Sequence, residues 1–274
     1  MTEFLKDRFN NKVMIITGAA RGIGEATALR AGQEGGLLVL VDKRQEEGED
    51  VLKKVLALGG KAIFLNLDIS IEENAKAMVE KAVATYGKLD IAINNAGVMG
   101  NPGNVANLSK EQMDFTMANN FYSVFFSCKY ELQQFIKQGN GGAIVNNASI
   151  AGITGLPGNA AYVASKHAVN GLTKNMALDY AGDKIRVNSV NPAGTSTPMV
   201  TEAYAYVLEK RKEAIAAGIS EEDAQSMAGE KQNSMLKREA TAQEQAASIL
   251  FLASDDASHM TGCIMATDGG WTSF

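Results

Sequence analysis

The sequence predicts an α/β domain in which a parallel sheet is covered by helices on both faces. Short apolar runs recur along the chain without strict polar alternation, which is typical of strands buried on both faces. Longer segments with helical periodicity lie between these runs, and such alternation with short connections indicates a parallel sheet. The expected strands are Val13–Thr17, Leu37–Val41, Ala62–Leu67, Leu89–Asn94, Ala143–Asn147, Ile185–Asn191 and Cys263–Thr267.

The expected helices occupy the intervals between these strands. The chain has no internal repeat, no low-complexity tract and no linker rich in Pro, Gly or Ser, so a single domain over residues 1–274 is the economical interpretation. The predicted helical segments are Ile23–Glu34, Gln45–Leu58, Glu72–Tyr86, Lys110–Gln138, Ala160–Tyr180 and Gln243–Ala253.

One segment, residues 199–237, interrupts the alternation before the last strand. It carries two helix-like stretches, Thr201–Ala217 and Glu221–Leu236. A long excursion outside the sheet is typical of a lid or a pocket wall. We therefore expect this segment to form a helical lid over a bound substrate.

The composition excludes several classes of function. Net charge is −5 and no long run of Lys or Arg occurs, so neither nucleic acid nor an anionic membrane is an expected partner. The apolar runs are too short to span a bilayer, and the N-terminal residues do not resemble a signal peptide. Two isolated cysteines indicate a reducing, cytoplasmic location, and two distant histidines without a Cys-x-x-Cys pair predict no metal site.

A glycine-rich loop, "TGAARGIG" at 17–24, follows the first strand and opens the first helix. Glycines at 18, 22 and 24 allow a tight turn and a close approach of the backbone to a pyrophosphate. The helix N-terminus adds free N–H groups and the positive end of a dipole. The loop predicts a dinucleotide site, although a glycine trio alone also fits an ordinary strand–helix turn.

Acidic residues at two strand ends extend this prediction. Asp42 ends the second strand, where a carboxylate accepts hydrogen bonds from an adenosine ribose and repels a 2′-phosphate. It favours NAD over NADP, while the neighbouring cations Arg21, Lys43 and Arg44 could weaken that preference. Asp68, at the end of the third strand, is either an adenine contact or a simple helix cap.

Several motifs together resemble the short-chain dehydrogenase/reductase family over nearly the whole chain, from about Lys12 to the end. The resemblance implies a single Rossmann domain with a doubly wound, seven-stranded parallel sheet, a nicotinamide cofactor and usually a tetramer. The matching motifs are the glycine loop with its Gly-x-x-x-Gly-x-Gly spacing, "NNAG" at 94–97, "NASIAG" at 147–152, "YVASK" at 162–166, "NPAGTSTPM" at 191–199 and "TDGGW" at 267–271.

The family's catalytic residues match four positions of this chain. The resemblance assigns them to Tyr162, Lys166, Ser149 and Asn120, with Asn119 adjacent to the last. A free tyrosine has a pKa of about 10, and an opposite charge nearby favours its ionised form. Lys166 follows Tyr162 by one helical turn, so it can supply that charge. The resemblance further implies that Ser149 holds the substrate oxygen and that Asn120 holds a water.

The family's cofactor contacts also match this sequence, with one departure. A proline–glycine pair after the sixth strand reads Pro192–Ala193 here, which puts the loop geometry in question. The resemblance assigns cofactor binding to Gly18, Arg21, Gly22, Ile23, Gly24, Asp42, Asp68, Ile69, Asn95, Ala96, Gly97, Tyr162, Lys166, Pro192, Thr195 and Thr197.

These observations predict an oxidoreductase that transfers a hydride between NAD and a small-molecule secondary alcohol or ketone. Two alternatives stay open: a 3-oxoacyl-carrier-protein reductase using NADPH, which Asp42 disfavours, and a non-catalytic nucleotide-binding redox sensor. The expected substrate pocket is mainly apolar and fits a neutral, medium-sized alcohol or ketone. Its candidate wall residues are Met99, Ile150, Ile153, Leu156, Tyr204, Tyr206 and Val207.

The C-terminus suggests an assembly. A last strand at the sheet edge followed by exposed aromatic side chains at Trp271 and Phe274 would be an association hazard in a monomer. A symmetric partner removes the hazard. The resemblance implies a homotetramer, with the segments Lys110–Gln138 and Ala160–Tyr180 at another interface. The alternative is that the tail folds back onto its own subunit.

Overall fold

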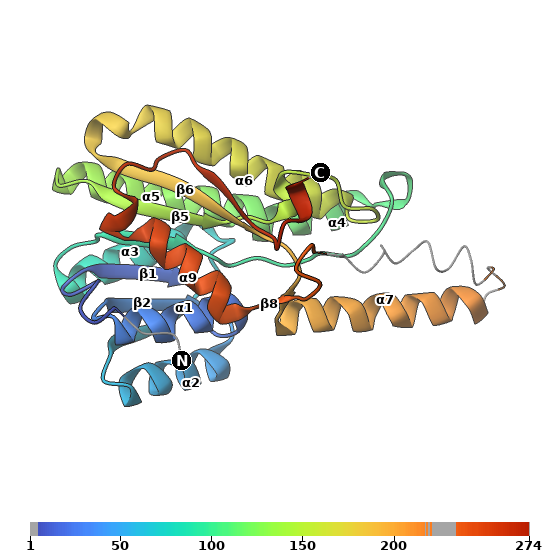
Figure 1. The fold of residues 1–274 in the computed structure, drawn as a ribbon, viewed down its shortest axis with the longest axis horizontal. Coiled ribbons are helices and arrows are strands. Elements are labelled where there is room, and N and C mark those ends of the chain that lie inside the picture. The colour runs from blue at the N-terminus through green and yellow to red at the C-terminus, as the bar shows by residue number, and fades with distance from the viewer. Residues whose placement is uncertain (1–4, 217, 219, 221–233, 274) are drawn as a thin grey trace.

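The computed structural model describes residues 5–216, 218, 220 and 234–273, and these form one α/β unit around a seven-stranded sheet. All paired strands of this sheet are parallel, in the order β3-β2-β1-β4-β5-β6-β9 (Figure 1). The predicted fold class is confirmed. The strands are β1 (Val13–Thr17), β2 (Leu37–Asp42), β3 (Lys61–Asn66), β4 (Ile91–Asn94), β5 (Gly142–Asn147), β6 (Ile185–Pro192) and β9 (Ile264–Thr267).

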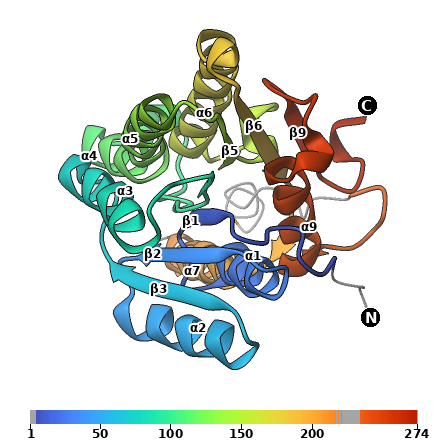
Figure 2. The ribbon, with the colours of Figure 1, turned by 90° about the vertical axis from the view of Figure 1, so that its left-hand side faces the viewer.

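Helices cover both faces of the sheet, as the end-on view in Figure 2 shows. One layer contains α1 (Gly22–Gln33), α2 (Gln45–Ala57) and α9 (Ala242–Ala253). The opposite layer contains α3 (Glu72–Tyr86), α4 (Lys110–Met117), α5 (Ser123–Gln138) and α6 (Ala160–Asp179).

The strand β1 explains why the apolar runs lack alternation. Val13 and Ile15 pack into the core under α3, α5 and α6, whereas Met14 and Ile16 pack into the core under α1 and α9. All four are fully buried, because successive side chains of a strand point to opposite faces. Each such side chain contributes about 1.5–3 kcal/mol through burial, so both helical layers are held to the same strand.

Two strands begin later than expected because side chains satisfy their first backbone groups. β4 begins at Ile91, not Leu89: the N–H of Leu89 donates to Gln138 Oε1 (2.8 Å), and its carbonyl accepts from Gln138 Nε2 (2.7 Å). β9 likewise begins at Ile264, since the N–H of Cys263 donates to Asn188 Oδ1 (2.9 Å).

The expected helix Lys110–Gln138 is interrupted. A π-helical turn, Ala118–Tyr122, separates α4 from α5. Such turns take up one extra residue within an α-helix and are frequent at functional sites. Asn120 lies in the middle of this turn, so the interruption occurs where a site residue was predicted.

The segment before the last strand is partly described. Its first helix is α7 (Pro198–Ala216), which projects away from the sheet in Figure 1. Residues 221–233 of the second expected helix, Glu221–Leu236, lie outside the described residues. Residues 234–237 are described and are not helical. A small sheet of β7 (Thr195–Ser196) and β8 (Ala240–Thr241), which the sequence did not predict, joins the two ends of this excursion.

The C-terminal tail differs from the expectation of exposed aromatic residues. Trp271 is half-buried in a short 3₁₀ helix, and Phe274 lies outside the described residues. Asp268 holds the tail, because its carboxylate accepts from the N–H groups of Gly270 (2.9 Å) and Thr272 (2.8 Å). Local bonds therefore order the described part of the tail, and the carbonyl of Gly269 accepts from the N–H of Leu236 (3.3 Å) in the same chain.

Candidate active site

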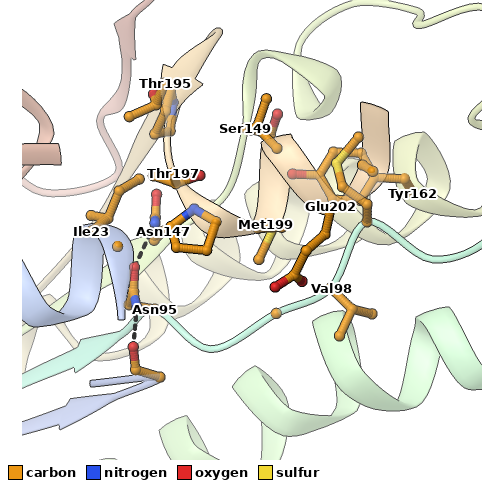
Figure 3. Close-up of a pocket in the computed structure, with 18 of the residues that line it drawn as sticks. Ile23, Asn95, Val98, Asn147, Ser149, Tyr162, Thr195, Thr197, Met199 and Glu202 are labelled. Atoms are coloured by element: carbon orange, nitrogen blue, oxygen red, sulfur yellow. Dashed lines mark hydrogen bonds between the residues drawn. The ribbon is translucent and has the colours of Figure 1, made fainter. Parts of the chain in front are cut away.

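A large pocket lies at the carboxyl ends of the strands, where the sheet order reverses between β1 and β4. Such switch points are the usual ligand sites of doubly wound sheets. The pocket has a volume of 1290 Å³ and extends from the glycine loop to α7 (Figure 3). Of the predicted site residues, Gly24 and Asn120 lie outside its lining. The structure brings the others together: Gly18, Arg21, Gly22, Ile23, Asp42, Asp68, Ile69, Asn95, Ala96, Gly97, Ser149, Tyr162, Lys166, Pro192, Thr195 and Thr197.

The glycine loop has the geometry of a phosphate-binding turn. Gly18 (φ +63°) and Gly22 (φ +59°) are in the left-handed region that favours glycine. A Cβ on Gly24 would lie 2.0 Å from the carbonyl oxygen of Gly18, so Gly24 supports the turn from behind. α1 begins at Gly22, and its N-cap residue, Arg21, makes no side-chain capping bond. The first N–H groups of α1 therefore suit a pyrophosphate.

A chain of hydrogen bonds connects this loop to the buried lysine. Asn95 Nδ2 donates to the carbonyl oxygens of Thr17 (3.1 Å) and Gly18 (3.0 Å), and Asn95 Oδ1 accepts from Asn147 Nδ2 (2.8 Å; Figure 3). Lys166 Nζ donates to the carbonyl oxygen of Asn147 (3.0 Å). The sequence reasoning missed Thr17 and Asn147, although both lie within the motifs that it identified.

Asp42 is held in a fixed orientation at the other end of the loop. Its Oδ2 accepts from the N–H of Ala20 (3.0 Å) and its Oδ1 from the N–H of Arg44 (2.9 Å). Each carboxylate oxygen accepts one of these bonds and keeps a further lone pair for a ligand. The carboxylate is therefore presented to the pocket in one orientation.

Asp68 lies two residues beyond the end of β3, not at its end. Its carboxylate accepts from the N–H (3.0 Å) and the hydroxyl (2.7 Å) of Ser70 and lies 3.6 Å from Lys43 Nζ. Burial alone would raise its pKa, but the bonds from Ser70 and the charge of Lys43 lower the pKa of Asp68. The residue shapes the turn before α3 and also lines the pocket beside Ile69.

Tyr162, Ser149 and Lys166 meet on one side of the pocket. In Figure 3 the hydroxyls of Tyr162 and Ser149 face one another. Burial raises the pKa of Tyr162, and the Ser149 hydroxyl opposes this rise. Lys166 Nζ lies 5.7 Å from the centroid of the Tyr162 ring, and burial lowers the pKa of Lys166 to about 8. The lysine alone therefore leaves Tyr162 protonated at neutral pH, contrary to the expected depression of its pKa.

Asn120 uses its side chain on the backbone of the pocket loop. Asn120 Oδ1 accepts from the N–H of Val98 (2.7 Å), while Nδ2 donates to the Val98 carbonyl (2.9 Å) and to Ser165 Oγ (3.1 Å). The side chain is fully buried. This pairing fixes the backbone at Val98, and it engages both the oxygen and the nitrogen of the Asn120 amide.

The loop after β6 accommodates the alanine that replaces the family's glycine. Ala193 does not adopt a positive φ, so its side chain causes no strain. The hydroxyl of Thr195 donates to the Ala193 carbonyl (2.9 Å) and accepts from Gln245 Nε2 (3.3 Å). Thr197 lies against the glycine loop, because a Cβ on Gly22 would come within 3.4 Å of its side chain.

An ion pair that the sequence did not reveal spans the pocket. Arg21 in the glycine loop binds Glu202 on α7, with Nη2 2.9 Å from Oε2 and a second bond between Nη1 and Oε1. The two residues are far apart along the chain, so only the fold shows that they meet.

The remaining wall of the pocket is mainly apolar. Ile153 lies outside this wall and is 40% exposed, contrary to the expectation. Met199 and Ala203 of α7 also line the pocket. The other predicted wall residues line it as expected: Met99, Ile150, Leu156, Tyr204, Tyr206 and Val207. Their apolar character suits a neutral organic ligand beside Tyr162.

The described part of the chain contains no helix of sufficient length and apolarity to cross a membrane. Within the same residues, no three His, Cys, Asp or Glu side chains gather as a metal site would require.

Comparison with known families gives a match over residues 18–272 to the family model described as enoyl-(acyl carrier protein) reductase. A 3beta-hydroxysteroid dehydrogenase from Mediterraneibacter gnavus is 42% identical over 273 residues, which cover 99% of this chain and 98% of that protein. The chain belongs to the short-chain dehydrogenase/reductase family.

Two more proteins resemble this short-chain dehydrogenase/reductase over its whole length. A cyclohexanol dehydrogenase from Acinetobacter sp. is 40% identical over 273 residues, with both chains covered to 100%. The crystal structure of carveol dehydrogenase from Mycobacterium avium in complex with NAD has a TM-score of 0.85 and 25% identity, and covers 98% of this chain and 100% of that one. The predicted family, Rossmann fold and enzyme class are confirmed: the chain is an NAD(P)-dependent oxidoreductase.

Proposed function

We propose that this enzyme transfers a hydride between NAD and the carbon of a secondary alcohol or ketone, with Tyr162 as the acid–base. The observation that carries the proposal is the meeting of Tyr162, Ser149 and Lys166 between the glycine loop and an apolar wall. When bound, the nicotinamide accepts or supplies the hydride. The protein's own residues bind the substrate, orient it and move the accompanying proton.

Tyr162 and Ser149 handle the substrate oxygen. The raised pKa of Tyr162 keeps its hydroxyl protonated at neutral pH, ready to donate to the oxygen of a ketone. Oxidation of an alcohol requires the ionised form, so its rate rises with pH. Ser149, whose hydroxyl faces that of Tyr162, donates a second hydrogen bond to the same oxygen and fixes it in position.

Lys166 and Asn120 support this pair. Lys166 is almost fully buried and is aimed by its bond to the Asn147 carbonyl, so it suits the ribose hydroxyls of the cofactor and stabilises the ionised Tyr162. Asn120 positions the Val98 loop through its side chain and holds a water next to Lys166. The two side chains lie close together, because a Cβ on Gly97 would lie 3.0 Å from Asn120 Oδ1 and 3.5 Å from Lys166 Nζ.

The cofactor preference rests on Asp42. Its carboxylate is fixed by two backbone N–H groups at the pocket end opposite Tyr162, where it accepts bonds from the adenosine ribose and repels a 2′-phosphate. We expect NAD to be preferred over NADP by at least about tenfold in kcat/KM. This preference disfavours the alternative of an NADPH-dependent 3-oxoacyl-carrier-protein reductase.

The apolar wall and the relatives support an alicyclic secondary alcohol as the substrate. The wall presents the uncharged side chains of Ile150, Leu156 and Tyr206 to the ligand. The names of two relatives, a 3beta-hydroxysteroid dehydrogenase and a cyclohexanol dehydrogenase, refer to hydroxyl groups on rings.

A substrate screen tests this proposal. Cyclohexanol, a substituted cyclohexanol and a 3β-hydroxysteroid are each offered with NAD, and NADH formation is followed by absorbance. We expect turnover of at least one of them, with linear primary alcohols of equal carbon number clearly slower. Turnover of a 3-oxoacyl thioester with NADPH, and of none of the cyclic alcohols, would favour the alternative.

The exposed face of the π-turn and α5 supports a homotetramer. Stacked rings of Phe121 and Phe125, and of Tyr122 and Phe126, run along it, and both Tyr122 and Phe125 are exposed. A partner that covers these rings removes an apolar patch from water. Light scattering tests the assembly, since a mass near 29.1 kDa would identify a monomer.

The two cysteines support a reducing, cytoplasmic location. Cys128 is buried and Cys263 is half-buried, and both are free thiols. Burial raises the pKa of both thiols, which keeps them unreactive.

A further inference from the structure

The ion pair between Arg21 and Glu202 joins the cofactor end of the pocket to the helix that walls the substrate end. The guanidinium donates two hydrogen bonds to the carboxylate, one of them 2.9 Å long. A two-point bond of this kind fixes the direction of the guanidinium as well as its position. Arg21 is therefore not free to turn toward another anion while Glu202 holds it.

The charges around this pair act on a 2′-phosphate in opposite directions. Asp42 repels it, whereas Arg21 and Arg44 attract it, and all three line the same pocket. Arg21 experiences the field of Asp42, and Glu202 experiences the fields of both arginines, with its pKa lowered first by the bond from Arg21. Without Glu202, the Arg21 guanidinium would be free to offset Asp42, beside Arg44, which lies 3.5 Å from Glu47 Oε1.

We infer that Glu202 is a second determinant of cofactor choice, which favours NAD by occupying the Arg21 guanidinium and so withholding it from a 2′-phosphate. This inference deepens the proposed NAD preference and rests on it. Asp42 acts on the phosphate directly, by repulsion. Glu202 acts through Arg21, from a helix that lies outside the sheet and outside the dinucleotide motifs.

A substitution at each end of the pair tests the inference by binding alone. Dissociation constants of NAD and NADP are measured by calorimetry for the unchanged protein, Glu202→Gln, Arg21→Gln and the double variant. Glu202→Gln should raise the affinity for NADP relative to NAD by about tenfold, the gain expected from one hydrogen bond to a charged group. The double variant should return the ratio to its original value, because the gain requires Arg21.

Glu213→Gln is the matched control. Glu213 lies on the same helix and is paired with Lys210 (2.7 Å), but it does not line the pocket. Its substitution should leave the NADP-to-NAD ratio unchanged. A merely structural role for the ion pair, as an anchor of α7, predicts that Glu202→Gln weakens both dinucleotides equally. An unchanged ratio in that variant would overturn the inference.

The same titrations separate this inference from the proposed function. If the unchanged protein binds NADP better than NAD, the proposed role of Asp42 fails, whatever Glu202 does. Asp42→Ala should raise the relative affinity for NADP in the presence or absence of Arg21. Glu202→Gln should do so only while Arg21 is present, and a gain that survives Arg21→Gln would also contradict the mechanism inferred here.

Discussion

The two ends of the pocket are built from different interactions. At the cofactor end, Asn95 and Asp42 bind backbone groups of the glycine loop, and each bond has a defined direction. At the substrate end, α7 presents Tyr204 and Tyr206, which are 44% and 37% exposed. Directional bonds specify one geometry, whereas an apolar wall accepts many shapes. The difference implies that the geometry of the cofactor end is tightly specified. The substrate end is selective only through a wall that tolerates change, and we call it the tolerant end.

Substitution of Tyr162 should have the largest effect, because it removes the proposed acid–base group itself. Tyr162→Phe deletes one hydroxyl and little volume, so the fold should persist. We expect kcat to fall by roughly 10²-fold or more, measured with an alcohol from the substrate screen, while the dissociation constant for NAD changes little.

The matched control for this change is Tyr204→Phe. It removes the same hydroxyl from a pocket tyrosine at the tolerant end, and kcat should stay within about twofold of the original, as for a surface substitution. Near-normal turnover in Tyr162→Phe would show that the proton moves through another group, and a comparable loss in Tyr204→Phe would contradict the comparison of the two ends.

Loss of the Asn95 side chain should have the next largest effect. Asn95→Ala leaves the carbonyls of Thr17 and Gly18 and the amide of Asn147 without their partner. We expect the free energy of unfolding in urea to fall by about 1–3 kcal/mol and NAD binding to weaken. The control Asn107→Ala, at an exposed position, should change neither quantity. Equal effects of the two variants would show that the bond chain does not hold the glycine loop.

A buried carboxylic acid on α5 should make stability depend on pH. Glu131 on α5 is fully buried and accepts from Asn94 Nδ2 (3.0 Å), beside the Cys128 thiol. Burial raises the pKa of Glu131 to about 8. The native state therefore keeps a proton that the unfolded chain loses at a pH of about 4.3. The contribution of Glu131 to the free energy of unfolding is fully present below that pH. It declines as the pH rises toward 8, by at most about 1.4 kcal/mol per pH unit.

The variant Glu131→Gln isolates this contribution. Its unfolding free energy, measured in urea at pH 5, 6, 7 and 8, should fall less steeply with pH than that of the unchanged protein. Substitution of the exposed Glu80 by Gln on α3 is the control and should leave the slope as it is. Parallel pH curves for Glu131→Gln and the unchanged protein would show that Glu131 is ionised in the fold.

The smallest effect is expected at the tolerant end. Tyr206→Ala enlarges the pocket at a half-exposed wall, so the KM for an alicyclic alcohol should rise by about threefold to tenfold. The kcat and the KM for NAD should remain close to their original values. A fall in kcat as large as that of Tyr162→Phe would show that this wall positions the reacting atoms, and the contrast between the two ends would disappear.

Local patterns predicted the fold, and they identified the residues that line the pocket beside the glycine loop. Each buried strand is a contiguous apolar run such as Val13–Thr17. The turn after this first strand needs glycine because Gly18 and Gly22 have positive φ, which is a local requirement of the eight-residue motif. Asp42 was found because it follows such a run directly. A residue at the carboxyl end of a parallel strand lies at the carboxyl edge of the sheet, whatever the position of that strand in the sheet order.

Contacts between distant residues could not be predicted in the same way. The pairing of Thr195–Ser196 with Ala240–Thr241 and the bond of Arg21 to Glu202 depend on how a long excursion returns to the sheet. The raised pKa of Tyr162 follows from burial, which a sequence does not quantify. The side chain of Gln138 binds the backbone of Leu89 in place of a neighbouring strand, which delays the start of β4. No local signal distinguishes such a side chain from that of an ordinary helix residue.

The π-helical turn at Ala118–Tyr122 separates the requirements for folding from those for function. An α-helix rotates by about 100° for each residue, so an ordinary insertion turns every later side chain away from its neighbours. The π turn absorbs one residue without passing that rotation on to α5. A shorter chain, lacking one residue of this turn, would keep the faces of α4 and α5 in phase and would still fold. It would lose the bulge that brings Asn120 to Val98, so the extra residue serves the loop at Val98 and not the helix.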